Sequence, residues 1–96
     1  MYVKVAGLYY SVEQKTNAEM NSRIGLADFN KQEILINKEH TEQTRKIAVY
    51  HEIIHILSDV YGLNLTEQQV QIGTHALIAF LSDNPQFKVE HCYETI

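Results

Sequence analysis

The feature that most constrains this chain is the pentapeptide HEIIH at residues 51–55, which lies inside a stretch of helical periodicity. From residue 41 to residue 62, apolar residues recur at three- and four-residue steps in TEQTRKIAVYHEIIHILSDVYG. Residues four apart share one face of a helix, so His51 and His55 can present two imidazoles to one metal ion. Glu52 is placed to hold a water in the metal's open position and to accept its proton. The motif therefore predicts a zinc site with His51 and His55 as ligands and Glu52 as general base.

Signals at both ends of this stretch place the motif in the interior of the helix. Thr41 is suited to the N-cap position, with Glu42 in the first turn, and Gly62 is suited to the position just after the C-terminus. We therefore do not expect the two histidines at a fraying end of the helix.

Length, charge and cysteine content exclude several classes of protein. Ninety-six residues predict a single domain spanning 1–96. A net charge of −4 argues against nucleic-acid binding, which needs a basic face, and no apolar stretch approaches the ~20 residues that span a bilayer. Cys92 is the only cysteine, so no internal disulfide can form, and the N-terminal residues lack the apolar run of a signal peptide. We expect a cytoplasmic protein.

The segments on either side of the motif helix predict an α+β domain. Alternating apolar residues in 2–13, around Ala6-Gly7, and in 24–37, around residues 30–32, indicate two β-hairpins. A second helix is expected from about residue 67 to 82, opened by a Thr66/Gln69 capping box. The expected fold is a small antiparallel sheet made of two hairpins, followed by two packed helices. The residues expected on the core face of the second helix are Val70, Gly73, Leu77, Phe80 and Leu81. Residues 86–96 either add an edge strand or fray.

The strand expected at 33–37 runs directly into the motif helix. In zinc peptidases a strand beside the active-site helix commonly presents an open edge, to which the substrate adds its own backbone as a further strand. The 33–37 strand is the candidate for that edge. The alternative is an internal strand that is paired on both sides.

A catalytic zinc usually takes three protein ligands, so a third must come from outside the motif. Glu67 opens the second helix and borders its apolar face, whereas His75 points away from that face but lies nearer the expected crossing with the first helix. Asp59 lies on the same helix as the motif, where it is better suited to accept a hydrogen bond from a ligand. We favour Glu67 over His75 and Asp59. For the oxyanion of the transition state the candidates are His75, Tyr50 and Tyr61, which the sequence does not rank.

Three segments give the chain a family resemblance: ADFNKQEILIN before the motif helix, AVYHEIIHILSDVYGLNLTEQQV, and ALIAFLSDNPQF at the end of the second helix. This ordered combination resembles the small HExxH metallopeptidase-like proteins of bacteria and their phages, which are related to the ImmA/IrrE gluzincin type. The resemblance implies a zincin-like fold, His51 and His55 as zinc ligands, Glu52 as base, and an acidic third ligand that Glu67 matches. Larger relatives cleave repressor proteins, which implies a protein substrate.

The function expected from the sequence is that of a zinc-dependent metallohydrolase, most simply a peptidase acting on a specific protein partner such as a repressor. Its cofactor would be Zn²⁺, with no nucleic-acid or membrane partner. One alternative is a regulatory or phage accessory protein that binds a metal for stability and a partner for function, without turnover. A second alternative is a helical interaction module that binds no metal, in which the HEIIH pattern is coincidental.

Overall fold

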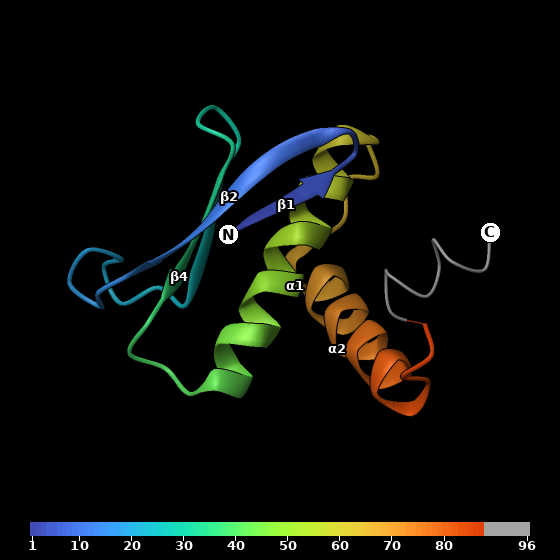
Figure 1. Ribbon diagram of the computed structural model, residues 1–96. Helices are drawn as coiled ribbons and strands as arrows, with labels where there is room; N and C mark the ends of the chain where they lie inside the picture. Colours follow the sequence, from blue (N-terminus) through green and yellow to red (C-terminus); the bar gives the residue numbers. More distant parts are fainter. Residues whose placement is uncertain (88–96) are drawn as a thin grey trace.

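Two β-hairpins lie side by side in one sheet, and a helix crosses one face of that sheet (Figure 1). The computed structural model describes residues 1–87, and Cys92 and most of the tail predicted at 86–96 lie outside that range. A second helix packs against the first. The elements are, in order, β1 (Tyr2–Val5), β2 (Leu8–Lys15), β3 (Gly25–Asp28), β4 (Glu33–Asn37), α1 (Glu42–Val60) and α2 (Glu67–Asp83). The predicted α+β class, with two hairpins followed by two helices, is confirmed.

Both hairpins turn where local chemistry predicts. Ala6 and Gly7 have φ values of 50° and 83°, the two positive angles that a type I′ turn requires. In the second hairpin, the Asp28 carboxylate accepts hydrogen bonds of 3.1 Å from the backbone N–H groups of Asn30 and Lys31. Each turn therefore brings its own two strands into antiparallel pairing.

The two hairpins are joined by a parallel pair of strands, so the sheet is mixed where the sequence predicted a purely antiparallel one. The strand order is β1-β2-β4-β3. β2 is long enough to serve both hairpins, because its first half pairs with β1 and its second half pairs in parallel with β4.

β4 lies inside the sheet, with β2 on one side and β3 on the other. The prediction that 33–37 forms the open edge is therefore wrong, and the alternative of an internal strand holds. The physical reason is the apolar composition of the strand, because a central strand buries its side chains more completely than an edge strand. Ile34 and Ile36 are 0% and 2% exposed. β3 is the outer strand beside the helices.

The hydrophobic core lies between the sheet and α1. Ile56 of α1 is fully buried against the inner face of the sheet, and Ala48 fills the space two turns earlier on the helix. Full burial of a side chain the size of Ile56 contributes roughly 1.5–3 kcal/mol to stability. The core consists of Val5, Tyr10, Ile34, Ile36, Ala48 and Ile56, with Val3, Val12, Ala27, Val49, Ile53 and Leu57 packed around it.

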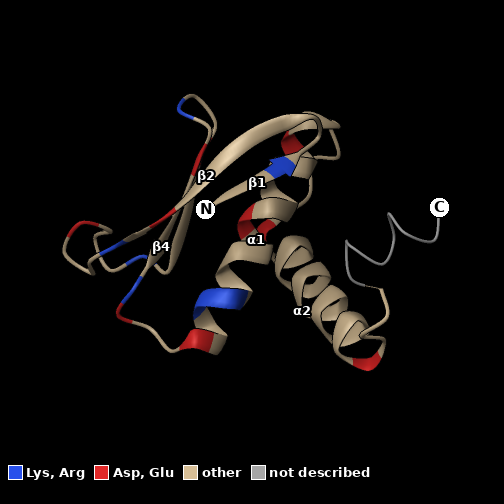
Figure 2. Cartoon of the chain, viewed as in Figure 1, with Lys and Arg blue, Asp and Glu red and all other residues tan. Residues whose placement is uncertain are grey.

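Among the described residues, α2 packs against α1 alone. Its contact face is centred on Val70 and Thr74, which are both fully buried. Leu77 and Phe80 are 38% and 48% exposed, so the predicted core face is wrong at these two positions. The helix carries charge only at its ends, on Glu67 and Asp83 (Figure 2).

The loop between β2 and β3 is tied to the end of β4 by a buried amide. The Asn37 side chain is fully buried, and its Nδ2 donates to the Asn17 side chain at 2.8 Å and to the Arg23 carbonyl oxygen at 3.0 Å. Its Oδ1 accepts from the Glu39 N–H at 3.0 Å. These bonds fix the point at which the chain enters β3. Neither helix of the described chain is long and apolar enough to cross a bilayer.

Candidate metal centre

The His pair projects from the middle of α1 on the side next to β3 and α2. The helix begins at the Thr41 N-cap, whose hydroxyl accepts from the Thr44 N–H at 3.2 Å, as the sequence predicted. Burial of Ile56 against the sheet sets the rotation of the helix, and His51 and His55 are consequently only partly buried. Their Nε2 atoms lie 3.2 Å apart, with the rings edge to face.

Glu67 reaches the two imidazoles from the first turn of α2. One of its carboxylate oxygens lies 2.7 Å from Nε2 of His51, and the other lies 2.8 Å from Nε2 of His55. The Glu67 side chain is otherwise 67% exposed, so only these contacts orient it. The favoured third residue of the sequence prediction is thus brought to the His pair.

The turn between the helices holds Glu67 in this position. Gly62, at φ 64°, and Leu63 donate to the Asp59 and Ser58 carbonyl oxygens at 3.3 and 2.9 Å, which is a Schellman motif. The buried Ser58 hydroxyl accepts from the Leu65 N–H at 3.0 Å. The predicted capping box of Thr66 and Gln69 then starts α2. The turn therefore sets the position of the next residue, Glu67.

The donor set suits a divalent metal ion. The ligating atoms of His51, His55 and Glu67 all lie within 4.8 Å of one another, close enough to bind one ion. Tetrahedral bonds of about 2.1 Å would place ligand atoms ~3.4 Å apart, near the 3.2 Å between the two Nε2 atoms. The Glu67 oxygens lie slightly closer, at hydrogen-bonding distance, and would move back a little to admit an ion. Two imidazoles and one carboxylate fit such a site.

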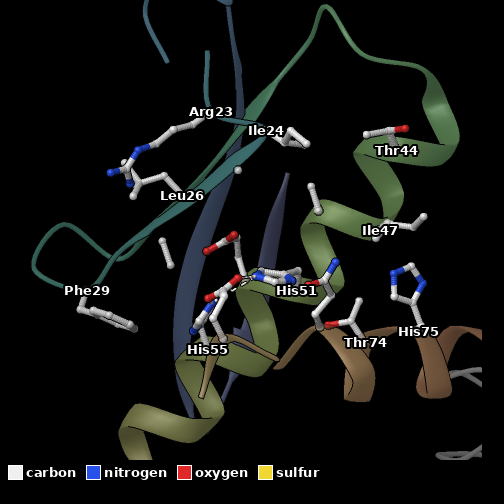
Figure 3. A pocket seen from close by; sticks show the side chains of 16 residues that line it. Arg23, Ile24, Leu26, Phe29, Thr44, Ile47, His51, His55, Thr74 and His75 are labelled. Atoms are coloured by element: carbon white, nitrogen blue, oxygen red, sulfur yellow. Dashed lines mark hydrogen bonds and ion pairs between the residues drawn. The ribbon is translucent and has the colours of Figure 1, made fainter. Parts of the chain in front are cut away.

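The other candidates from the sequence lie apart from this cluster. His75 lines the same cleft farther along α2, away from the His pair (Figure 3), and Asp59 is exposed near the end of α1. Tyr50 lines a separate hollow on the other side of the helix pair, and Tyr61 is 63% exposed beyond α1. Of the three residues considered for the oxyanion, only His75 therefore faces the cleft.

Glu52 is buried beside the cluster, at 8% exposure. Burial raises the pKa of the Glu52 carboxyl above its ordinary value, and the nearby Glu67 charge acts in the same direction. His51, His55 and the backbone N–H of Ala27 act on this pKa in the opposite direction and favour the charged form. A carboxylate with a raised pKa accepts a proton more readily near neutral pH than an exposed one.

The cluster lies in an open cleft of about 620 Å³ bounded by β3, α1 and α2. Figure 3 shows the imidazoles near the centre, with Ile24 and Thr44 toward one end and Phe29 toward the other. Ile24 and Phe29 are 45% and 43% exposed. Arg23 is the only Lys or Arg among the lining residues, so the carboxylates face little competing positive charge. The cleft thus has an exposed apolar side chain toward each end and a cluster that can accept a cation at its centre.

Gly25 and Ala27, which line the cleft from β3, were not predicted as site residues. The Asn37 N–H donates to the Ile24 carbonyl oxygen at 2.9 Å, so these two residues are a hydrogen-bonded pair. Because such pairs alternate along an antiparallel ladder, the backbone groups of Gly25 and Ala27 face away from β4, toward the edge of the sheet that no other described strand covers. A glycine within a short strand is itself a signal of close backbone approach.

Comparison of the chain with known protein families, with curated proteins and with solved structures found no match. The resemblance to small HExxH metallopeptidase-like proteins therefore stays a prediction from the sequence. We therefore infer the chemistry of the site from its geometry.

Proposed function

We propose that this protein is a zinc-dependent hydrolase that cleaves a polypeptide. The observation that supports this most strongly is the convergence of His51, His55 and Glu67 beside the buried carboxylate of Glu52. Two imidazoles and one carboxylate with an open side form the donor set of catalytic zinc sites. A structural zinc site would be closed by a fourth protein ligand, and this cluster has three among the described residues.

The chain's own residues would divide the work of hydrolysis between them. A bound zinc ion would supply a Lewis acid and lower the pKa of an attacking water. His51, His55 and Glu67 would hold the ion, and Glu52 would accept the proton of the water at its carboxylate and later donate it to the leaving amine. His75 is the lining residue that could donate a hydrogen bond to the oxyanion.

A polypeptide suits the cleft because one edge of β3, beside the cluster, pairs with no other strand within residues 1–87. The outward backbone groups of Gly25 can pair with an extended chain, in the manner of β-strand addition. Ile24 and Phe29, exposed at the two ends, can contact apolar substrate side chains on either side of the cleaved bond. A specific protein partner, such as a repressor, would supply this segment. A chain with one cysteine has no need of an oxidising compartment, and we place the reaction in the cytoplasm.

Hydrolysis of an unfolded polypeptide by the zinc-loaded protein tests this proposal. Fragments are identified by mass spectrometry. The controls are the protein freed of zinc with a chelator and the Glu52→Gln variant. The amide of Gln has nearly the size of the carboxylate but cannot accept the proton, so turnover should fall at least ~10²-fold while zinc stays bound. A wild-type protein that binds zinc and cleaves neither unfolded polypeptides nor a co-purifying partner would contradict the peptidase and support the accessory-protein alternative.

A further inference from the structure

We propose that Gly25 is a positioning residue for Glu52: the lack of a side chain at residue 25 provides the space in which the Glu52 carboxylate is held beside the metal ligands. This inference rests on the proposed hydrolytic function for its consequence, although the contact itself is independent of it. It adds a residue from the sheet to a site otherwise built from the two helices.

The contact is specific to the reactive end of Glu52. A Cβ atom at residue 25 would lie 3.1 Å from Oε2 of Glu52 and 3.4 Å from its Cγ. The same atom would lie 3.4 Å from Cβ of Ala48, one turn earlier on α1. Glycine at residue 25 and alanine at residue 48 together let the edge strand approach the helix closely. The Glu52 side chain occupies the gap between them.

Gly25 leaves space for the Glu52 side chain, and the backbone N–H of Ala27, two residues later, acts on the same carboxylate and favours its charged form. That N–H points toward the edge of β3 that pairs with no other described strand. Residues two apart on a strand face the same way, so both act on Glu52 from one wall of the cleft. Glu52, a residue that is 8% exposed, thus lies enclosed between the strand and the helix.

The backbone itself does not require glycine at residue 25. Gly7 and Gly62 are the glycines with positive φ in the described chain, and Gly25 is not among them. A methyl group at residue 25 would therefore disturb its neighbours without straining the main chain. Since the closest atom that it would meet is the far end of a flexible side chain, the Glu52 carboxylate would be displaced while the backbone keeps its fold. A small displacement of a reacting group, on the order of 1 Å, can cost ~10²-fold in rate.

Gly25→Ala, Glu52→Ala and the double variant, compared with wild type, form the test. Zinc affinity and the thermal midpoint are measured for all four proteins, and kcat and KM for hydrolysis of an unfolded polypeptide where there is turnover. Gly25→Ala should keep its zinc affinity and lose at least about tenfold in kcat, with little change in KM. Gly73→Ala is the matched control, because a Cβ at residue 73 meets only Ile54 at 3.9 Å, and its kcat should be unchanged.

The thermal midpoints decide the inference even if no hydrolysis is found. The Gly25→Ala substitution should lower the thermal midpoint more in the wild-type background than in the Glu52→Ala background. In the Glu52→Ala background, the side chain that the added methyl group would displace is absent. If Gly25→Ala fails to fold, Glu52→Ala must restore folding. An equal shift in both backgrounds, or a loss of zinc in Gly25→Ala, would overturn the positioning role. Absence of turnover in wild type alone would instead contradict the proposed hydrolase.

Discussion

Glu67 and His75 lie two turns apart on the same helix, and only Glu67 contacts the two imidazoles. Glu67→Ala should therefore lower zinc affinity at least ~10²-fold. Substitution of residues that only hydrogen-bond to metal ligands already lowers metal affinity about 10–100-fold. His75→Ala should leave zinc affinity unchanged and affect turnover alone. Competition with a fluorescent zinc chelator measures both. Loss of zinc in His75→Ala and retention in Glu67→Ala would assign the third ligand to His75.

The histidines of the HEIIH motif should differ from a histidine outside it in their effect on zinc binding. His51→Ala removes an atom that lies 3.2 Å from its counterpart on His55, and should reduce zinc binding by as much as Glu67→Ala. His40 lies before α1, outside the cluster, so His40→Ala should bind zinc like wild type. The same chelator competition applies. Equal losses in both variants would mean that the zinc site is elsewhere.

At the scale of elements, α2 contains a glycine with room for a side chain. Gly73 lies within the helix, and an added Cβ would make an ordinary contact with Ile54 at 3.9 Å. Because alanine is favoured over glycine in a helix interior by about 1 kcal/mol, Gly73→Ala should raise the free energy of unfolding by roughly that amount. Urea denaturation measures it. A destabilised variant would mean that α1 leaves no room for a methyl group at residue 73.

The turn between the helices should matter for the metal as well as for stability. Ser58→Ala leaves the Leu65 N–H without its acceptor, which should cost about 1–3 kcal/mol and loosen the placement of Glu67. We expect a lower urea midpoint together with weaker zinc binding. Ser82→Ala, at an exposed position near the end of α2, is the control and should change neither. Weaker stability with unchanged zinc affinity would show that the turn does not position Glu67.

The elements that local chemistry determines were predictable from the sequence. Thr41, Gly62 and the Thr66/Gln69 pair mark helix ends because each satisfies backbone groups within a few residues. His51 and His55 were assigned to one face because helical spacing alone decides it. The face of α2 was not predictable to the same degree. Thr74 is buried there because its hydroxyl bonds to the Val70 carbonyl oxygen at 2.8 Å, which makes a polar residue acceptable in the contact.

At the scale of the whole molecule, the order of the strands depends on contacts between distant segments. The parallel pairing of β2 with β4 has no turn to signal it, so the sequence indicated two hairpins but not how they join. The position of β3 at the edge followed from that pairing, and with it the approach of Gly25 to Glu52. The apolar run of β4 was the one available sign that this strand is central.

Metal binding should stabilise the whole molecule, because the ligands come from both helices. α2 packs on α1 alone within the described residues, so an ion held by His51, His55 and Glu67 would add a link between them. Zinc at 100 times its dissociation constant should add about 2.7 kcal/mol to the free energy of unfolding. Calorimetry with zinc and after chelation measures this. The shift should vanish in His51→Ala, and a shift that persists there would come from a different site.

We propose that this chain holds one zinc ion where α1 and α2 meet, between His51, His55 and Glu67. Elemental analysis of the purified protein, reloaded with zinc and freed of excess, tests it most directly, with the His51→Ala/Glu67→Ala variant beside it. One cluster of three ligands predicts about one zinc per chain in wild type and close to none in the variant. A zinc content near zero in wild type, or equal contents in the two proteins, would contradict the metal centre and the hydrolase proposed from it.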